Sequence, residues 1–457
     1  MSETAVSVAS PRTPDGAGQP WPSPARAWYA VGIFALALTI NFLDRGILNL
    51  LIEPVKHDLH LTDVQVSYLV GIAFVLFYVI LGLPIARLVD SKSRRLIIGL
   101  GILTWSFMTA FCGLAQSFWQ LFVGRVGVGV GEACNGPSTY SMLADLFPHE
   151  KLPRAISVLN FGFVTGTALA SLLGGAVIHF VSTLPPISFP VVGVLRPWQL
   201  TFILVAMPGF VVASLFTTVQ EPLRRGRVIL AGQAVQSLPV REVVRFLVAN
   251  RGTYGPMFLG LAFNSVVFFG IQTWTPAFFS RTFGWTPAQI GVIFGLVLLI
   301  VAPVGLMCGS LLAERFAKRG RADANLLVTL IAFALAVPAS ILFPLMPTPE
   351  LSIAMLGVLF FVAMLSPGPQ NAALQIITPN QMRGQVTALY LFVFNAIGFG
   401  TGATVVAFVT DHIFHNEALI GYSMVTVGAV LGPISALFIW AGLKPYAASV
   451  LRARNWS

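Results

Sequence analysis

Charged residues and cysteines are both scarce in this chain of 457 residues. Only 10% of the residues are charged, whereas soluble domains carry roughly 25%, so an ordinary soluble protein is excluded. The three cysteines, Cys112, Cys134 and Cys308, lie in apolar stretches and have neither a metal-ligand spacing nor the pattern of a disulfide framework. No glycine-rich loop of the kind that binds ATP is present, which argues against an ATP-driven pump.

What the chain does contain is long apolar runs. Hydrophobic residues make up 56% of it, and its mean hydropathy is +0.82. A net charge of +10 could indicate nucleic-acid binding, but the basic residues sit in short loops between apolar runs. That placement is typical of the cytoplasmic loops of membrane proteins. We therefore expect a multi-pass integral membrane protein with no nucleic-acid partner.

About twelve apolar spans, bounded by polar or Gly/Pro breaks, form two sets of six. A run of about 20 apolar residues is long enough to cross a bilayer as a helix. The spans fall at 28–54, 63–88, 96–115, 118–146, 154–181 and 198–219, and then at 253–280, 287–313, 323–345, 351–378, 383–411 and 419–443. The expected fold class is therefore an all-α integral membrane protein with about twelve transmembrane helices in two six-helix pseudo-repeats.

These spans divide the chain into tails, bundles and a linker. The predicted parts are a disordered cytoplasmic tail without a cleaved signal (1–26), a first bundle (27–219), a cytoplasmic linker (220–252), a second bundle (253–443) and a cytoplasmic tail (444–457). Within the linker, residues 238–249 alternate Val and Leu with Arg and Glu, which predicts an amphipathic helix on the membrane surface. A plain solvated linker is the alternative. Lysine and arginine crowd the loops on the side of the chain ends, so both termini are expected in the cytoplasm, most simply at a bacterial inner membrane.

One charge pattern repeats between the halves. Residues 90–95 follow the second span and read Asp-Ser-Lys-Ser-Arg-Arg. Residues 314–319 follow the eighth span and read Glu-Arg-Phe-Ala-Lys-Arg, with the acid and the basic pair at the same spacing. Parallel six-helix repeats of this kind are the architecture of one large class of transporters.

These motifs resemble those of a known family. Residues 86–95 are similar to motif A of the major facilitator superfamily, and residues 125–133, Arg-Val-Gly-Val-Gly-Val-Gly-Glu-Ala, are similar to its fourth-helix motif. Residues 41–45, Asn-Phe-Leu-Asp-Arg, together with the glycine run and Ala-Asp-Leu-Phe at 144–147, resemble the Spinster branch of lipid transporters. The resemblance implies the major facilitator fold, alternating access and lysolipid or sphingolipid substrates. The chain departs from motif A in having alanine or serine at three positions that usually hold glycine or a basic residue.

Charged residues fall at membrane depth in the first half. Asp44 lies about 17 residues, roughly 25 Å, into the first span, and Glu132 lies about 14 residues, roughly 21 Å, into the fourth. Because these spans run in opposite directions, both acids are expected near the middle of the membrane. A charge at that depth costs at least about 2.5–3.5 kcal/mol on insertion scales, so such residues are functional candidates.

We assign substrate contact or proton coupling to Asp44, Arg45, Glu132 and Arg125. Burial pushes a carboxylate toward protonation and a nearby arginine opposes this, so Asp44 or Glu132 can exchange protons. The alternative is that static ion pairs only join the first and fourth helices. Asp44 and Arg45 are adjacent and therefore about 100° apart around the helix, so one faces the cavity while the other pairs with a neighbouring helix. The sequence leaves open which.

The family resemblance also implies a cytoplasmic charge cluster that keeps the inner side closed while the transporter is open to the outside. Its expected members are Asp90, Arg94, Arg95, Asp145 and Arg154, with Glu314, Lys318 and Arg319 as the counterpart in the second half. The alternative is ordinary charge that only orients the protein in the membrane.

Amides and aromatic residues take the place of charge at membrane depth in the second half. The candidates for lining a substrate cavity are Asn41, Asn264, Gln272, Gln370, Asn371 and Asn395. Each amide could equally form a hydrogen bond between helices. In the cavity interpretation, a head group meets Arg45 and Glu132, and an acyl chain lies against the second half.

The sequence thus predicts a secondary transporter that works by alternating access, is coupled to protons and moves a lipid-like or amphipathic organic anion. A proton-driven multidrug or small organic-acid carrier of the same fold is the alternative. An enzyme would need a nucleophile–base or metal cluster, and a channel would need repeated polar faces; neither pattern is seen. Asp411, His412 and His415 could ligate a metal, but a solvated loop is the favoured interpretation. We expect no cofactor besides a proton gradient, a small amphipathic substrate and membrane lipids as partners, and a monomer.

Overall fold

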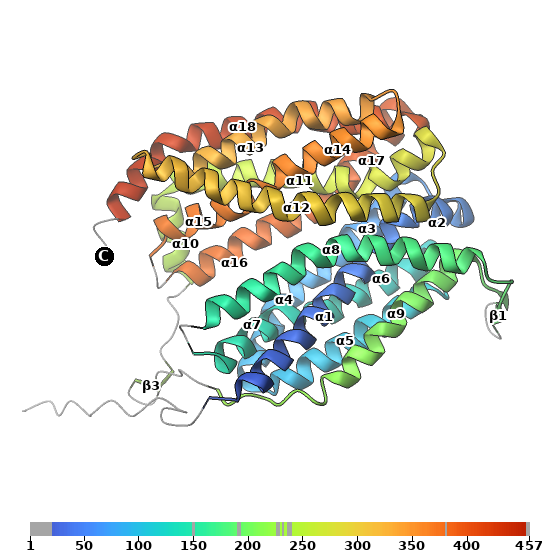
Figure 1. Ribbon diagram of the computed structural model, residues 1–457, viewed down its shortest axis with the longest axis horizontal. Coiled ribbons are helices and arrows are strands. Elements are labelled where there is room, and N and C mark those ends of the chain that lie inside the picture. The colour runs from blue at the N-terminus through green and yellow to red at the C-terminus, as the bar shows by residue number, and fades with distance from the viewer. Residues whose placement is uncertain are drawn as a thin grey trace, which may run out of the picture.

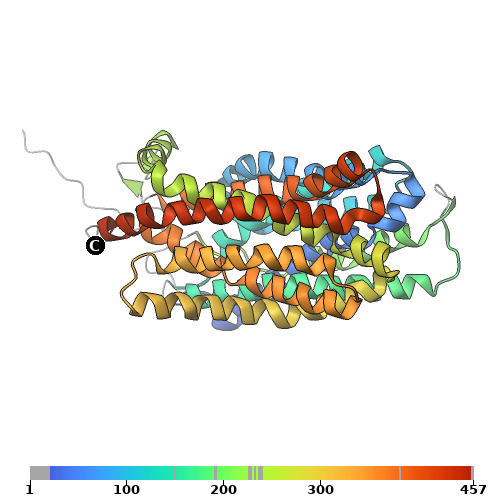
Figure 2. The ribbon, with the colours of Figure 1, turned by 90° about the horizontal axis from the view of Figure 1, so that it is seen from above.

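The computed structural model describes residues 21–148, 151–189, 193–224, 229–230, 233–234, 240–379 and 382–453. Most of these residues are helical, and the helices pack as two bundles side by side (Figure 1). Most helices run roughly along the long axis of the molecule, as the two perpendicular views show (Figures 1 and 2). By length and composition, ten segments of the described chain can cross a membrane. The other two predicted spans, 118–146 and 154–181, are also helical, so the expected fold class is confirmed.

In the first bundle, breaks divide some of the predicted spans into two helices each. Gly71 interrupts the second span, and the fourth span breaks after Glu132. Thr62 begins the helix before Gly71 with a capping box, in which its side chain and that of Gln65 satisfy backbone N–H groups. The helices are α1 (Pro24–Leu50), α2 (Ile52–Leu59), α3 (Asp63–Val70), α4 (Ile72–Ser91), α5 (Arg94–Cys112), α6 (Phe118–Glu132), α7 (Asn135–Leu146), α8 (Leu152–Ser182) and α9 (Pro197–Leu215).

Short elements connect the helices. A two-stranded antiparallel hairpin, β1 (Ser188–Phe189) with β2 (Gly193–Val194), precedes α9, and a second, β3 (Ile229–Leu230) with β4 (Gln233–Ala234), follows it. In the linker, α10 (Val240–Ala249) occupies most of the stretch predicted as an amphipathic helix, of which residues 238–239 lie outside the described part. Val243 is buried against the second bundle, whereas Val244 and Val248 are exposed. Contact of that exposed face with a membrane stays a prediction.

The second bundle has longer helices, and one of its spans changes its helical pitch twice. That span is the eleventh, which contains two π-helical turns, η2 and η3. The elements are α11 (Arg251–Phe283), α12 (Pro287–Lys318), α13 (Ala324–Leu342), η1 (Phe343–Leu345), α14 (Pro349–Met364), α15 (Pro367–Ile377), α16 (Arg383–Val393), η2 (Phe394–Phe399), α17 (Gly400–Phe408), η3 (Val409–Phe414), η4 (Glu417–Leu419) and α18 (Ile420–Ala453).

The first and last helices of the chain extend beyond their predicted ends. Helix α1 begins at Pro24, inside the stretch predicted as a disordered tail, whose residues 1–20 lie outside the described part. Helix α18 continues to Ala453, ten residues beyond the boundary predicted at 443. The reason is packing: Tyr446 is fully buried, and the hydroxyls of Ser449 and Thr253 lie 2.9 Å apart in a hydrogen bond. The prediction of a tail from residue 444 is therefore wrong up to Ala453.

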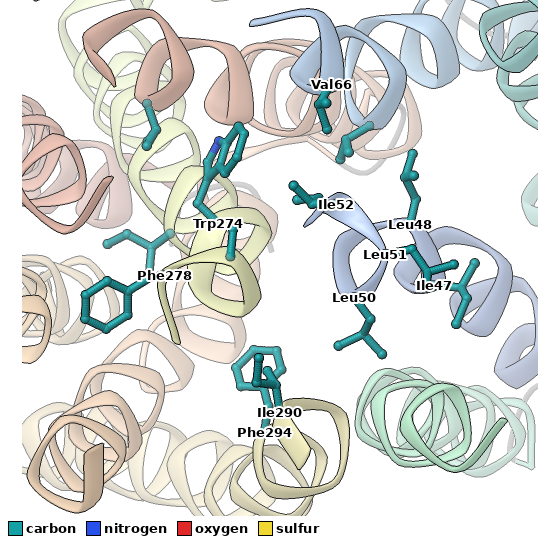
Figure 3. Close-up of a cluster of buried hydrophobic side chains, with 14 of the residues drawn as sticks. Ile47, Leu48, Leu50, Leu51, Ile52, Val66, Trp274, Phe278, Ile290 and Phe294 are labelled. Atoms are coloured by element: carbon teal, nitrogen blue, oxygen red, sulfur yellow. The ribbon is translucent and has the colours of Figure 1, made fainter. Parts of the chain in front are cut away.

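The molecule has two distinct ends, which we call proximal and distal. The proximal end carries α10, the start of α1 and the end of α18, and the distal end carries α2, η4 and the β1–β2 hairpin (Figure 1). Near the distal end the bundles share an apolar core. Figure 3 shows Leu50 and Ile52 of the first bundle facing Trp274 and Phe294 of the second. The Trp274 indole N–H donates to the Ala403 carbonyl at 2.8 Å, which fixes the ring within this core.

Small residues bring the two bundles close together at two places. Between α8 and α12, a β-carbon on Gly291 would lie 2.8 Å from the Cα of Gly175. Between the α3–α4 break and α17, a β-carbon on Gly71 would lie 2.7 Å from the carbonyl oxygen of Gly400. Either contact is too short for a side chain, so glycine is required for the backbones to meet. The second contact lies close to the charged residues of the first bundle, because Gly71 stands between Leu69, which contacts Arg125, and Phe74, which contacts Arg45.

Candidate substrate and proton site

Asp44 and Arg45 are neighbours on α1 with different surroundings. The Nε of Arg45 donates to Oε2 of Glu132 at 2.5 Å and joins α1 to α6, while 18% of the Arg45 side chain stays exposed. Asp44 is fully buried, and its carboxylate has no ion-pair partner among the described residues; the indole N–H of Trp105 is a neighbouring donor, outside good hydrogen-bond geometry. The 100° turn between successive residues separates the two side chains. Arg45 is therefore the one that reaches accessible space.

Arg125 lies deeper than Arg45 and contacts backbone rather than carboxylates. Its Nε donates to the Leu69 carbonyl at 3.2 Å, and its Nη1 donates to the Asp44 carbonyl at 3.3 Å. Its Nη2 has no partner among the described residues, although only 1% of the residue is exposed. Arg125 therefore ties α6 to α1 and α3 and keeps one buried N–H group free to bind.

Two aromatic rings of α4 lie under the guanidinium of Arg45. Its Cζ is 4.5 Å from the ring centre of Phe74 and 5.1 Å from that of Tyr78, and the two rings stack 5.5 Å apart. Arg125 approaches Phe74 at 5.8 Å. Cation–π contacts are worth about 2 kcal/mol or more where water is excluded. The Phe74 ring thus contacts both cations, the partly exposed Arg45 and the buried Arg125.

Several buried polar atoms around these charges lack hydrogen-bond partners among the described residues. They are both carboxylate oxygens of Asp44, Oε1 of Glu132, Nη2 of Arg125 and the indole Nε1 of Trp105. Trp105 neighbours Asp44 and Asn41 neighbours Glu132, but neither contact has good hydrogen-bond geometry. Each unsatisfied group of this kind costs about 1–3 kcal/mol. A bound ligand, water or proton relieves that cost, so a cluster of such atoms is suited to binding. The four charged groups sum to zero net charge when all are ionised.

The candidate cavity amides are more scattered. Asn41 is buried on α1, one turn before Arg45 and close to Glu132. Gln370 is also buried and leaves its Nε2 without a described partner, while Asn264 and Gln272 are half-buried on α11. The remaining two donate to carbonyls of their own helices, Asn371 to Pro367 and Asn395 to Leu391. Cavity lining by these amides stays a prediction.

A second charged cluster surrounds Arg94 at the proximal end. Arg94 is 1% exposed, pairs with Asp145 of α7 and donates from Nε to Glu221 at 2.9 Å. Glu221 also accepts from the backbone N–H of Arg95 at 2.8 Å and from the Ser93 hydroxyl at 2.9 Å. Burial raises the pKa of Glu221, but these hydrogen bonds outweigh it and hold that pKa below its usual value of 4.5.

The structure thus brings together part of the predicted switch cluster. Arg94, Arg95 and Asp145 are neighbours, and Glu221 joins them unpredicted; its signal in the sequence is a single acid just after the sixth span. Arg154 lies elsewhere, with its guanidinium 5.6 Å from the ring of Trp28. The side chain of Asp90 lies outside the described part of the structure.

The predicted counterpart in the second half does not assemble. Glu314, Lys318 and Arg319 are exposed near the end of α12 and form no ion pair with any described residue. Near-identical spacing in the two halves therefore does not give the same contacts. The first-half cluster depends on Asp145 and Glu221, which come from outside the repeated motif.

A third charged cluster, which the sequence did not predict, joins the bundles at the distal end. Asp63 of α3 is fully buried and accepts from Arg281 of α11 at 2.7 and 2.8 Å and from Lys56 of α2 at 2.5 Å. Arg281 also pairs with Glu53 at 2.8 Å, and Lys56 pairs with Glu417 of η4 at 2.6 Å. We call these five residues the distal cluster. Arg281 and Glu417 are far along the chain from the other three members, so no local spacing in the sequence signals this cluster.

The acid and histidines considered for a metal belong to the π-helical turn η3 rather than to a solvated loop, except for His415, which follows it. Asp411 accepts the backbone N–H of Val64 at 2.9 Å, and His412 stacks on Phe408 with ring centres 4.7 Å apart. Within the described chain, no group of three or more His, Cys, Asp or Glu residues is placed to hold a metal ion. Asp411 instead adds a contact between the bundles.

Two bundles of apolar helices, with buried charges inside the first bundle and at the distal contact between the two, are the architecture expected of a multi-pass membrane transporter. Residues 34–403 match the Major Facilitator Superfamily. The chain belongs to this superfamily, whose members are transporters of the alternating-access type.

Individual relatives support the same assignment. An MFS-type efflux pump of Mycolicibacterium smegmatis is 28% identical over 438 residues, which are 94% of this chain and 95% of that protein. Protein spinster of Drosophila melanogaster is 22% identical over 64% of this chain and 46% of its own length. The crystal structure of a bacterial homolog to the human lysosomal transporter Spinster, inward-facing and unoccupied, matches with a TM-score of 0.76 at 24% identity, covering 94% of this chain and 99% of that one. The resemblance to the Spinster branch is thereby confirmed.

Proposed function

We propose that this protein is a proton-coupled transporter of an amphipathic organic anion, with both chain ends in the cytoplasm. The single observation that carries the proposal is the Arg45–Glu132 ion pair beside the buried carboxylate of Asp44, which forms no ion pair among the described residues. Buried charges without full compensation lower the stability of the fold, so their presence inside a transporter favours a role in transport. Lipid-like anions of the lysophospholipid or sphingolipid type are the proposed substrates, as the resemblance of residues 41–45 and 144–147 to the Spinster branch implies.

Arg45 is the proposed binding group for the anionic head. Its guanidinium keeps 18% exposure and can form a bidentate pair with a phosphate or carboxylate. The rings of Phe74 and Tyr78 beside it provide apolar surface for the part of the substrate nearest the head. An anion that takes Arg45 competes directly with Glu132.

That competition supplies the proposed link to protons. When an anion occupies Arg45, the fully buried carboxylate of Glu132 loses its ion-pair partner, and an unpaired buried charge is costly. A proton on Glu132 removes that cost, so anion binding and proton binding favour each other. Asp44, which is fully buried without an ion-pair partner among the described residues, is the proposed second acid.

Reconstituted protein tests the coupling. Palmitoyl lysophosphatidate is added to liposomes that hold a pH-sensitive dye, and substrate-dependent proton movement is recorded. We expect the double variant Asp44→Asn, Glu132→Gln to lose it, while the exposed-acid control Glu314→Gln keeps it. Arg45→Ala is expected to weaken binding roughly tenfold or more, the size of a lost charged hydrogen bond. Proton movement that persists in the double variant would show that these acids do not carry the coupling.

A second candidate is proton-driven efflux of drug-like amphiphiles. It is favoured by one observation, the match along 94% of this chain to a protein named an MFS-type efflux pump. A binding screen that compares lysophospholipids, sphingoid phosphates and drug-like cations separates the two. Preference for cations would favour efflux and would be at odds with Arg45 as the head-group site.

A further inference from the structure

The π-helical turn η2 gives the eleventh span an unusual aromatic face. In a regular α-helix, residues five apart point about 140° away from each other. The i to i+5 bonding of a π-helix brings such residues onto one face. Accordingly Phe394 and Phe399, at the two ends of η2, both contact Phe269 of α11, each with ring centres 5.2 Å apart. Such π-helical turns occur frequently at functional sites.

Phe399 also reaches across to the first bundle. Its ring meets Phe74 edge-on with centres 5.6 Å apart, and Phe74 is the ring that lies 4.5 Å below the guanidinium of Arg45. Phe74 is 1% exposed, whereas Phe399 is half-buried. One buried ring therefore separates Phe399 from the proposed head-group site, and Phe399 keeps surface available for contact.

On the distal side of this aromatic pair, the seam between α3 and α17 is closed. The backbones meet at Gly71 and Gly400 without room for a β-carbon, and the Ser67 hydroxyl donates to Thr404 at 3.1 Å. A molecule held at Arg45 therefore cannot extend past Phe399 unless this seam opens. Phe74 and Phe399 lie between Arg45 and this closed seam, and we call these two rings the end wall.

We propose that Phe399 is a specificity-determining residue that sets the length of the apolar group accepted beside Arg45, and that η2 places it there. This inference rests on the proposed function, because it takes the substrate to be an amphipathic anion. The preferred ligand has an acyl or aryl group that ends against the Phe399 ring. Removing the ring lengthens the space available, and enlarging it shortens that space.

Chain-length preference tests the proposal. Phe399 lies close to Arg45, since Phe74 is 4.5 Å from the guanidinium and 5.6 Å from the Phe399 ring, so short ligands are the suitable probes. Binding of propyl, butyl, pentyl and hexyl phosphate to the purified protein is measured for wild type, Phe399→Ala and Phe399→Trp. We expect the optimum to move to longer chains in Phe399→Ala and to shorter chains in Phe399→Trp, with about fourfold in affinity for each methylene gained or lost. Phe408→Ala, the same change at a ring that is 52% exposed, is the control and should keep the wild-type optimum. An optimum that stays in place in both Phe399 variants overturns the proposal.

A ligand-free measurement separates this proposal from the transport function. In protein whose three native cysteines are replaced by serine, Phe399→Cys and Phe74→Cys are treated with a water-soluble maleimide. We expect Phe399→Cys to react and the buried Phe74→Cys to react at least tenfold more slowly. If wild type binds no alkyl phosphate, the proposed head-group site is wrong, and this arm alone decides the position of Phe399. Equal rates at the two positions would refute the end wall.

Discussion

The guanidinium of Arg94 joins three segments of the first bundle at once. Besides its pairs with Asp145 and Glu221, it donates from Nη1 to the carbonyl and hydroxyl of Ser141 and from Nη2 to the carbonyl of Pro222. A buried cation is stabilised only when its donors are satisfied in this way. The start of the linker is therefore held against α5 and α7 through one side chain.

Glu221 is the partner of Arg94 whose loss is simplest to measure. Glu221→Gln removes a charged acceptor that is 29% exposed, and we expect a loss of about 1–2 kcal/mol in stability near neutral pH. Because the folded-state pKa of Glu221 lies below its usual 4.5, this contribution is full above that value and disappears as pH falls through the lowered pKa. Thermal unfolding at decreasing pH, with Glu242→Gln on exposed α10 as control, checks it. A difference that persisted in acid would rule out the charge as its source.

The sequence predicts a residue's role where that role follows from its position in a local pattern. It does not predict a role that depends on a partner far away along the chain. The depth of Asp44 and Glu132 follows from counting along apolar spans, and α1 and α6 do bring Arg45 and Glu132 together. The pair between Asp63 and Arg281 joins positions 218 residues apart, and no local spacing encodes it. The same holds for Glu221, which pairs with Arg94 only because α9 packs along α5 and brings the start of the linker to it.

At the scale of elements, pitch and helix ends were the features that hydropathy could not reveal. The turn η2 adds one residue per turn inside a helix that is apolar all round, so the hydrophobic pattern is the same with or without it. The end of α18 was missed because Lys444 and Pro445 lower the local hydropathy. Tyr446 and Val450 nevertheless lie on the buried face, four residues apart.

The packed end of α18 makes a direct prediction. Tyr446→Ala empties a fully buried site and should cost about 3–5 kcal/mol, as other large aromatic truncations do. Trp440→Ala on the same helix, at a side chain that is 64% exposed, should change stability far less. Unfolding midpoints in detergent compare the two. Equal effects would mean that the helix end does not support the second bundle.

At the scale of the whole molecule, the distal cluster links the two bundles by charge. Within the described chain, Arg281 is the only member of the distal cluster that belongs to the second bundle and pairs with two acids of the first. Breaking a buried ion pair by removing one partner costs about 3–5 kcal/mol. We therefore expect Arg281→Gln to destabilise the arrangement in which the distal ends touch.

Distances between spin labels at His57→Cys and Glu350→Cys, on the two bundles near the distal end, check this expectation. Arg281→Gln should add a population with a longer distance. The control is Arg196→Gln, because Arg196 is 48% exposed and pairs with Asp58 inside the first bundle; its distance distribution should match that of the wild type. An unchanged distribution in folded Arg281→Gln would show that other contacts keep the distal ends together.

The glycine contact between α8 and α12 bears on how the bundles move. At Gly175 and Gly291 the helices meet backbone to backbone, and one turn further along α12 the Leu172 side chain packs against Gly295. One bundle can therefore turn on the other about this line while the two helices stay in contact there. The Phe74–Phe399 and Ser67–Thr404 contacts, in contrast, must separate in such a turn. The α8–α12 contact is thus the natural axis of rotation, and the seam between the α3–α4 break and α17 is the part that opens.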